Sequence, residues 1–166
     1  IRSCLVGSEM CIRDRLNGTP LEVQDGHTTP EASFLQPALN NMVEHNCKLL
    51  AMEVSSIGLS LKRVEGLKFD VACFTNLSRD HINFHGSMEA YGRAKSLLFS
   101  EYLKERSTAV LNIDDPFFKH IKLALKGNTV LLSYGTDQSA DLRITSIENT
   151  LQGVNATIKI HDIEHN

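Results

Sequence analysis

The stretch DVACFTNLSRDHINFHG, residues 70–86, joins a short apolar run to a dense group of polar side chains. Its first six residues have the length and composition of a strand that is buried on both faces of a parallel sheet. In open α/β sheets, ligands bind beyond the carboxyl ends of the strands. A functional site is therefore predicted at the polar group, which holds Asn76, Arg79, Asp80, His81 and His85.

Strands and helices alternate along the rest of the chain. Further apolar runs of strand length lie at residues 48–54, 107–112 and 128–135. Residues 142–160 alternate apolar and polar side chains, which predicts a terminal antiparallel pair. The fold class that follows is α/β, with a mostly parallel sheet flanked by helices and a short antiparallel β element at the C-terminal end.

Helices are predicted between these strands from their caps and apolar spacing. The first would run from about Phe34 to His45, because Ser33 and Gln36 form a capping-box pattern and Pro37 is tolerated only in a first turn. A second helix would occupy residues 87–105, and a third would follow a cap at Asp115 and end before Gly127. Ser87 is the expected cap of the second helix.

Composition excludes several classes of function. The chain has 166 residues, of which 42% are hydrophobic and 22% charged, as expected for one domain with an ordinary core. The net charge of −3, with both signs interspersed, argues against a nucleic-acid partner, and the lack of a run of about 20 apolar residues argues against a membrane partner. The cysteine spacings fit neither a paired metal site nor a dense disulfide framework, which favours a cytoplasmic protein.

The first fifteen residues, IRSCLVGSEMCIRDR, differ from the rest. They show no signal-peptide order of charged, apolar and small segments, and they resemble translated sequencing-adapter read-through. We therefore expect residues 1–15 to be an artefact and the fold to begin near Leu16. The alternative is a genuine strand or arm.

Residue types alone leave the chemistry of the polar groups open. Glu53 lies near the end of the run at 48–54, where a carboxylate is costly to bury unless it is paired or binds a metal. A hydrogen-bonded structural glutamate fits as well. His81 and His85 could bind a metal or could be ordinary loop histidines.

Four motifs in a fixed order carry a family resemblance. TTPE at 28–31, AMEVSS at 51–56, FTNLSRDHINFHGSMEAYGRAK at 74–95 and LNIDDP at 111–116 resemble the central ATPase domain of the Mur ligases. The resemblance covers roughly Leu16 to the end. The joined EVSS and NLSRDHINFHG motifs are similar to the subgroup that adds the third amino acid to the peptidoglycan stem peptide.

The resemblance implies an ATP-dependent acid–amino-acid ligase of peptidoglycan biosynthesis. ATP would phosphorylate a carboxylate of UDP-N-acetylmuramoyl-L-alanyl-D-glutamate, and a diamino acid would attack the acyl phosphate, with Mg²⁺ between the crowded anions. The implied partners are the UDP-N-acetylmuramoyl dipeptide, the amino acid and ATP, and the implied parent enzyme is a monomer.

The resemblance also assigns roles to residues. Glu53, His81 and Lys95 match the metal site, Lys95 as the lysine that the family carbamylates and, with His81, as a catalytic group. We expect their side-chain ends to lie within roughly 10 Å of one another. Asn76, Arg79, Asp80 and His85 would support the site, with Asp80 orienting His81 or a metal-bound water.

The substrate side is implied in the same way. The matching positions for the nucleotide dipeptide are His27, Thr28, Thr29, Ser55 and Arg63. Arg63 is suited to phosphate or carboxylate by its bidentate fork. Ile57 and Leu61 depart from the family by replacing a His and a Gln, which removes two polar contacts.

No GxxxxGK[ST] phosphate loop occurs in the sequence, and YGRAKS at 91–96 has the wrong spacing and falls inside a predicted helix. We therefore expect residues 16–166 to be a partial Mur ligase central domain that lacks turnover by itself.

Two alternatives belong to other functional classes. A metal-dependent hydrolase would use Glu53, His81 and His85 around an open coordination position. A non-catalytic, degenerate binding domain of the same fold is supported by Ile57 and Leu61.

Overall fold

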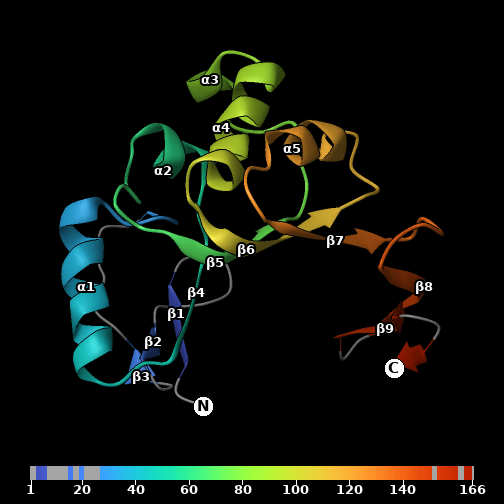
Figure 1. Cartoon of the computed structure of the whole chain (residues 1–166), viewed down its shortest axis with the longest axis horizontal. Helices are drawn as coiled ribbons and strands as arrows, with labels where there is room; N and C mark the ends of the chain where they lie inside the picture. The colour runs from blue at the N-terminus through green and yellow to red at the C-terminus, as the bar shows by residue number, and fades with distance from the viewer. Residues whose placement is uncertain are drawn as a thin grey trace. The chain divides into compact units, whose positions relative to one another are not determined.

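A computed structural model describes residues 27–150 and 153–160 in full, and the backbone of residues 3–6, 15–16, 19–20 and 163–165. The chain divides into two compact units, residues 1–67 and 68–166. They run from blue to green and from green to red in Figure 1. None of the helices among these residues is both long and apolar enough to cross a membrane.

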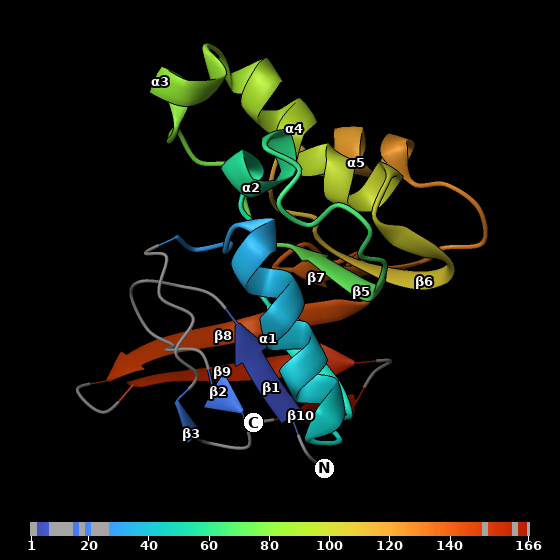
Figure 2. The same cartoon turned by 90° about the vertical axis from the view of Figure 1, so that its left-hand side faces the viewer.

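The first unit has a four-stranded sheet in the order β3-β2-β1-β4. Its elements in chain order are β1 (Ser3–Val6), β2 (Arg15–Leu16), β3 (Thr19–Pro20), α1 (Ala32–Glu44), β4 (Leu49–Met52) and α2 (Ser56–Ser60). Strand β4 is parallel to β1, and the other two pairs are antiparallel. Helix α1 runs beside β1, as Figure 2 shows.

Strand β1 falls within the segment that resembles adapter read-through. Its backbone pairs with β4 from Ser3 opposite Leu49 to Val6 opposite Met52. The origin of residues 1–15 stays a prediction.

The second unit has a six-stranded sheet in the order β10-β9-β8-β7-β6-β5. Its strands are β5 (Phe69–Phe74), β6 (Leu103–Asn112), β7 (Val130–Gly135), β8 (Leu142–Thr150), β9 (Gly153–Ile160) and β10 (Ile163–His165), and its helices are α3 (Ile82–His85), α4 (Met88–Ser100) and α5 (Phe118–Ala124). The pairs from β5 to β8 are parallel, and β8, β9 and β10 are antiparallel. This confirms the predicted α/β class with its antiparallel C-terminal element.

The parallel strands do not form one sheet. The strand predicted at 48–54 is β4, which pairs with β1, and the strand predicted at 70–75 is β5, which pairs with β6. Each pairing is parallel, as expected, but the two strands belong to different sheets.

Helices α4 and α5 lie on one side of the β5–β7 part of the sheet (Figure 1). The core there consists of Ala72, Phe74, Phe99, Ala109, Leu111 and Ile121, all buried. Alternate strand residues face the helices, as the two-residue period of a strand requires. This packing fixes the carboxyl ends of β5, β6 and β7, from which the polar loops emerge.

Helix boundaries depart from the sequence prediction at α1. The helix begins at Ala32, with Glu31 as its N-cap residue, so Ser33 and Pro37 both lie inside it. The backbone N–H groups of Phe34 and Leu35 both donate to the Glu31 carbonyl oxygen at 2.9 Å. Pro37 therefore costs α1 one backbone hydrogen bond, which the prediction treated as prohibitive.

The predicted cap of α4 is confirmed and that of α5 is wrong. The Ser87 hydroxyl accepts a hydrogen bond from the Ala90 N–H at 3.1 Å, as the sequence predicted for α4. Helix α4 is shorter than predicted because β6 already begins at Leu103. Helix α5 begins at Phe118 with Phe117 as its N-cap residue, and Asp115 accepts from the Phe117 N–H at 2.8 Å in the turn before the helix.

Candidate functional site

The carboxyl end of β4 is tied to the segment before α1 through Thr29. Thr29 is fully buried, and its hydroxyl accepts a hydrogen bond from the Ser55 N–H at 2.8 Å. The same hydroxyl lies 3.1 Å from the Glu53 carbonyl oxygen, within donating distance. Thr29 therefore fixes the backbone of the EVSS motif on both sides of Val54.

Arg63 completes this network from the turn after α2. Its side chain is buried, and one Nη donates to the Thr29 carbonyl oxygen at 3.0 Å. The other Nη forms an ion pair with Glu31 at 2.6 Å. The Arg63 Nε is buried and has no hydrogen-bond partner among the residues that the structure describes. Both Nη groups are thus engaged with the protein.

Helix α2 packs closely against the same threonine. The Ser55 hydroxyl caps the helix by accepting from the Gly58 N–H at 3.0 Å. A Cβ placed on Gly58 would lie 2.9 Å from the Thr29 Cβ, so a side chain there would displace Thr29. Ile57 is partly buried and Leu61 is exposed, so both departures from the family pattern lie on this short helix and its end.

The five predicted substrate residues therefore fall into two groups. Thr29 and Arg63 are buried and hold the segment together. His27 is exposed, and Thr28 and Ser55 are partly exposed, so these three can reach a ligand.

In the second unit, Tyr91 of α4 brings three predicted residues together. The His85 ring stacks on the Tyr91 ring with centroids 5.2 Å apart, and the His81 ring meets it edge-on at 5.9 Å. The Lys95 Nζ lies 5.2 Å from the centroid of the same ring. Tyr91 was absent from the sequence prediction, since an aromatic residue at helical spacing is usually core. Indeed, it is buried.

His81 and Asp80 form the turn between β5 and α3. His81 has a positive φ of 53° and is the N-cap residue of α3. Its backbone N–H donates to Asp80 Oδ1 at 2.7 Å, and its Nε2 lies 3.5 Å from Asp80 Oδ2. Asp80 therefore lies close enough to orient the imidazole, and the role expected for it stays a prediction.

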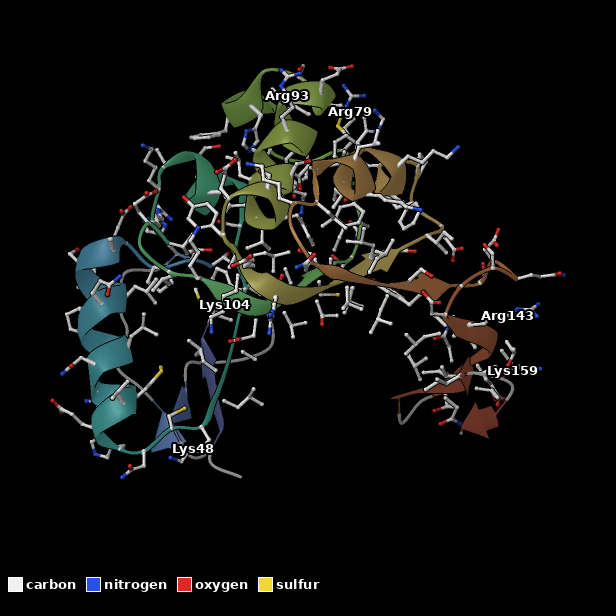
Figure 3. All side chains as sticks on the ribbon, in the orientation of Figure 1. Lys48, Arg79, Arg93, Lys104, Arg143 and Lys159 are labelled. Carbon is white, nitrogen blue, oxygen red and sulfur yellow. The ribbon has the colours of Figure 1, made fainter. Side chains whose placement is uncertain are left out.

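The charges of this corner are mostly positive. Desolvation lowers the pKa of His85, and the nearby His81 and Lys95 lower it further by Coulomb repulsion. Figure 3 shows Arg79 and Arg93 at the same α3–α4 end of the second unit. The cations of this corner favour an anionic ligand, while the carboxylates of Asp80 and Glu89 oppose one.

The neighbouring loops are held by carboxylates that the sequence analysis did not single out as site residues. Asp115 Oδ2 accepts from the Leu77 N–H at 2.7 Å and so anchors the loop that carries Asn76 and Arg79. Asp114 Oδ2 accepts from the Thr136 N–H at 2.7 Å, linking the ends of β6 and β7. Both carboxylates belong to the motif LNIDDP, in which the sequence analysis predicted only a helix cap at Asp115.

The predicted metal ligands lie in both units. Glu53 follows β4 in the first unit, whereas His81 and Lys95 lie in the second. Their convergence stays a prediction. In the described part of the chain, no three His, Cys, Asp or Glu side chains are grouped as metal ligands.

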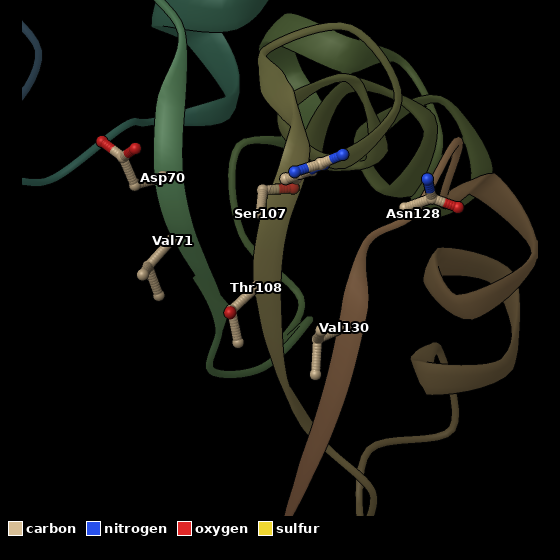
Figure 4. Close-up of a pocket in the computed structure, with 7 residues that line it drawn as sticks. Asp70, Val71, Ser107, Thr108, Asn128 and Val130 are labelled. Atoms are coloured by element: carbon tan, nitrogen blue, oxygen red, sulfur yellow. The ribbon is translucent and has the colours of Figure 1, made fainter.

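A hollow of about 510 Å³ lies elsewhere in the second unit. Figure 4 shows it at the β5, β6 and β7 strands, lined by Asp70, Val71, Arg106, Ser107, Thr108, Asn128 and Val130. These residues lie just before β7 or in the first and central parts of β5, β6 and β7, and none lies at the carboxyl end of its strand. Because ligands of such sheets bind at the carboxyl ends, we do not assign the site to it.

Comparison with known proteins identifies the family of the chain. The sequence profile of the Mur ligase middle domain matches residues 6–166. The chain is 46% identical over 136 residues to UDP-N-acetylmuramoyl-L-alanyl-D-glutamate–L-lysine ligase of Staphylococcus haemolyticus, covering 80% of this chain and 27% of that protein. The Staphylococcus aureus protein of the same name is 42% identical over the same length. The chain thus spans about a quarter of the length of these relatives.

Solved structures give the same result. A UDP-N-acetylmuramoyl-L-alanyl-D-glutamate–2,6-diaminopimelate ligase superposes with a TM-score of 0.80 and 30% identity, over 99% of this chain and 32% of that one. The apo form of FPGS from L. casei superposes at a TM-score of 0.69 with 14% identity, covering 98% of this chain and 44% of that one, a likeness of fold alone. From the profile match over residues 6–166 and these relatives, the chain belongs to the Mur ligase family.

Proposed function

We propose that the chain is part of a UDP-N-acetylmuramoyl-tripeptide synthetase, an ATP-dependent ligase that adds a diamino acid to UDP-N-acetylmuramoyl-L-alanyl-D-glutamate in the cytoplasm. The observation that carries the proposal is the grouping of His81 and Lys95 around one buried ring, beyond the carboxyl end of β5. Its support is the 46% identity to a ligase named for this dipeptide substrate.

The substrate would bind along the segment before α1. His27, Thr28 and Ser55 would contact the UDP-N-acetylmuramoyl dipeptide, because they are the accessible members of the predicted set. Thr29 and Arg63 would hold the backbone that carries these residues. An anionic group of the substrate could reach Arg63 only by replacing Glu31, which holds one Nη at 2.6 Å.

The metal would be Mg²⁺, held by the Glu53 carboxylate, the His81 imidazole and a carbamate on Lys95. Reaction of the neutral Lys95 amine with CO₂ forms an N–C bond and releases a proton, which turns a cationic side chain into an anionic oxygen ligand. Bound Mg²⁺ would neutralise the phosphate charge that builds up during phosphoryl transfer. Asp80 would keep the His81 ring in place.

The reaction would proceed through an acyl phosphate. ATP would transfer its γ-phosphoryl group to a substrate carboxylate, and the amine of the incoming amino acid would displace phosphate to form the amide. A phosphate loop is needed to hold ATP, and the sequence contains no GxxxxGK[ST] motif. The chain alone is therefore expected to release no phosphate.

The test compares the 166-residue chain with a full-length ligase that contains it. Phosphate release is measured with and without the nucleotide dipeptide, and with lysine or diaminopimelate as the second substrate. Release by the long enzyme that requires both the dipeptide and a diamino acid would support the proposal. If the long enzyme hydrolyses ATP without either, or the short chain turns over by itself, the proposed function is wrong.

A further inference from the structure

Tyr91 belongs to α4, and its ring contacts residues at both ends of α3. His81 and His85 lie four residues apart at the start and end of α3, and Tyr91 and Lys95 lie four residues apart on α4. Residues at this spacing share one helix face. The two imidazoles and the ammonium therefore meet at the one aromatic ring, at centroid or Nζ distances of 5.2 to 5.9 Å.

The ring itself is well anchored. Tyr91 is only 5% exposed. The next residue, Gly92, faces Phe117 of α5 so closely that a Cβ there would lie 2.3 Å from the Phe117 ring. Helix α4 therefore sits tightly against α5, and Tyr91 cannot shift without moving that contact.

We propose that Tyr91 is a positioning residue, which sets the location of His81 and Lys95 through their contacts with its ring. The proposal rests on the roles proposed above for His81 and Lys95. A lysine side chain has four rotatable bonds, and the ammonium head of Lys95, before the side chain is carbamylated, gains a preferred location from the negative face of the ring. The edge-on contact does the same for the imidazole of His81.

The ring, and not the phenol hydroxyl, carries this role. Tyr91→Phe keeps the ring and should preserve both contacts, whereas Tyr91→Leu and Tyr91→Met remove the aromatic face and fill the space with apolar atoms. Tyr102→Leu is the matched control, because Tyr102 is also a buried tyrosine of the second unit, at 8% exposure, and makes none of the three contacts described.

The first measurement needs no activity. In the 166-residue chain, side-chain scalar couplings of His81 and Lys95, which report their rotamer populations, are recorded by NMR. The rotamer preferences should persist in Tyr91→Phe and Tyr102→Leu, and should be lost in Tyr91→Leu and Tyr91→Met. Unchanged rotamer preferences in Tyr91→Leu would overturn the proposal, whatever the enzyme does. If Tyr91→Leu fails to fold, Tyr91→Met gives the same reading.

The second measurement uses the full-length ligase. Misplacing a reacting group by about 1 Å can cost about 100-fold in rate, so Tyr91→Leu should lower kcat at least about tenfold and raise the Mg²⁺ concentration for half-maximal rate. The KM for the amino acid should not change, and Tyr91→Phe should stay within about twofold of the unaltered enzyme. If the unaltered ligase is active and Tyr91→Leu matches its kcat and Mg²⁺ dependence, the positioning role is refuted while the proposed function stands. An inactive unaltered ligase would refute the proposed function instead.

Discussion

Replacing Arg63 by Met should loosen the first unit by about 2 kcal/mol. The change keeps an unbranched side chain as far as the position of Nε and removes the guanidinium donors. The buried Thr29 carbonyl oxygen then loses the hydrogen bond that it receives at 3.0 Å, and an unsatisfied buried acceptor costs about 1–3 kcal/mol. The ion pair with Glu31 adds less than about 1 kcal/mol, because the Glu31 side chain is 45% exposed. Relief of the buried Arg63 Nε, which has no partner in the described part of the chain, offsets some of this loss.

Two further variants separate these terms. Glu31→Gln removes only the charge of the ion pair and should cost less than about 1 kcal/mol. Arg63→Lys keeps the charge, but an ammonium cannot match both partners of the guanidinium group. Its stability cost should therefore fall between those of Glu31→Gln and Arg63→Met. If Glu31→Gln costs as much as Arg63→Met, the ion pair and not the Thr29 contact holds the segment.

The two units can be followed separately. All three tyrosines, at 91, 102 and 134, lie in the second unit, so tyrosine emission reports on that unit. Hydrogen exchange of peptides within residues 27–67 reports on the first. A loss of 2 kcal/mol should speed exchange there about 30-fold and leave the tyrosine unfolding transition unchanged. Unchanged exchange at 27–67, or equal acceleration in both units, would refute the argument.

Three further predictions concern the second unit. Gly92→Ala should destabilise it by about 1–2 kcal/mol in urea unfolding followed by tyrosine emission, because the cost of crowding the Phe117 ring exceeds the gain in helix propensity of about 1 kcal/mol. The Thr136 N–H lowers the pKa of Asp114 below 3.8, so this carboxylate stabilises the fold above that pH and ceases to do so as the pH falls through its lowered pKa. Asp114→Asn should therefore unfold at lower urea than the unaltered chain at pH 7, with the difference shrinking toward pH 2. Asp80→Asn in a full-length ligase should reduce turnover without changing the melting temperature, and full turnover would return Asp80 to a purely structural role.

The sequence predicted the sheet strands and their polar loops well, because both depend on local patterns. The apolar run ending at Phe74 and the serine cap at Ser87 need only neighbouring residues to be recognised. The start of α1 was predicted wrongly because it depends on a residue that is distant in the sequence. Glu31 is the N-cap residue of α1 and forms an ion pair with Arg63. Helix propensity and the capping pattern at Ser33 depend only on neighbouring residues, so neither predicts that contact.

The ring contacts that group His81, His85 and Lys95 could not be predicted from the sequence. The motifs located His81, His85 and Lys95, but the ring that gathers them, Tyr91, has the same periodicity as any buried helix residue. Only its contacts distinguish it from ordinary core. The same holds for Asp115, whose second oxygen reaches across to the Leu77 backbone.

Burial distinguishes residues to which the family resemblance assigns the same role. Thr29 and Thr28 are adjacent in TTPE, yet Thr29 is fully buried with its hydroxyl engaged by the EVSS backbone, whereas Thr28 is partly exposed. A ligand could contact the first hydroxyl only after those hydrogen bonds break, and could contact the second without any rearrangement. Loss of the Thr29 hydroxyl should therefore affect ligand binding indirectly, through the backbone that carries Thr28 and Ser55. In this segment, the residues that hold the backbone are distinct from those that would touch the substrate.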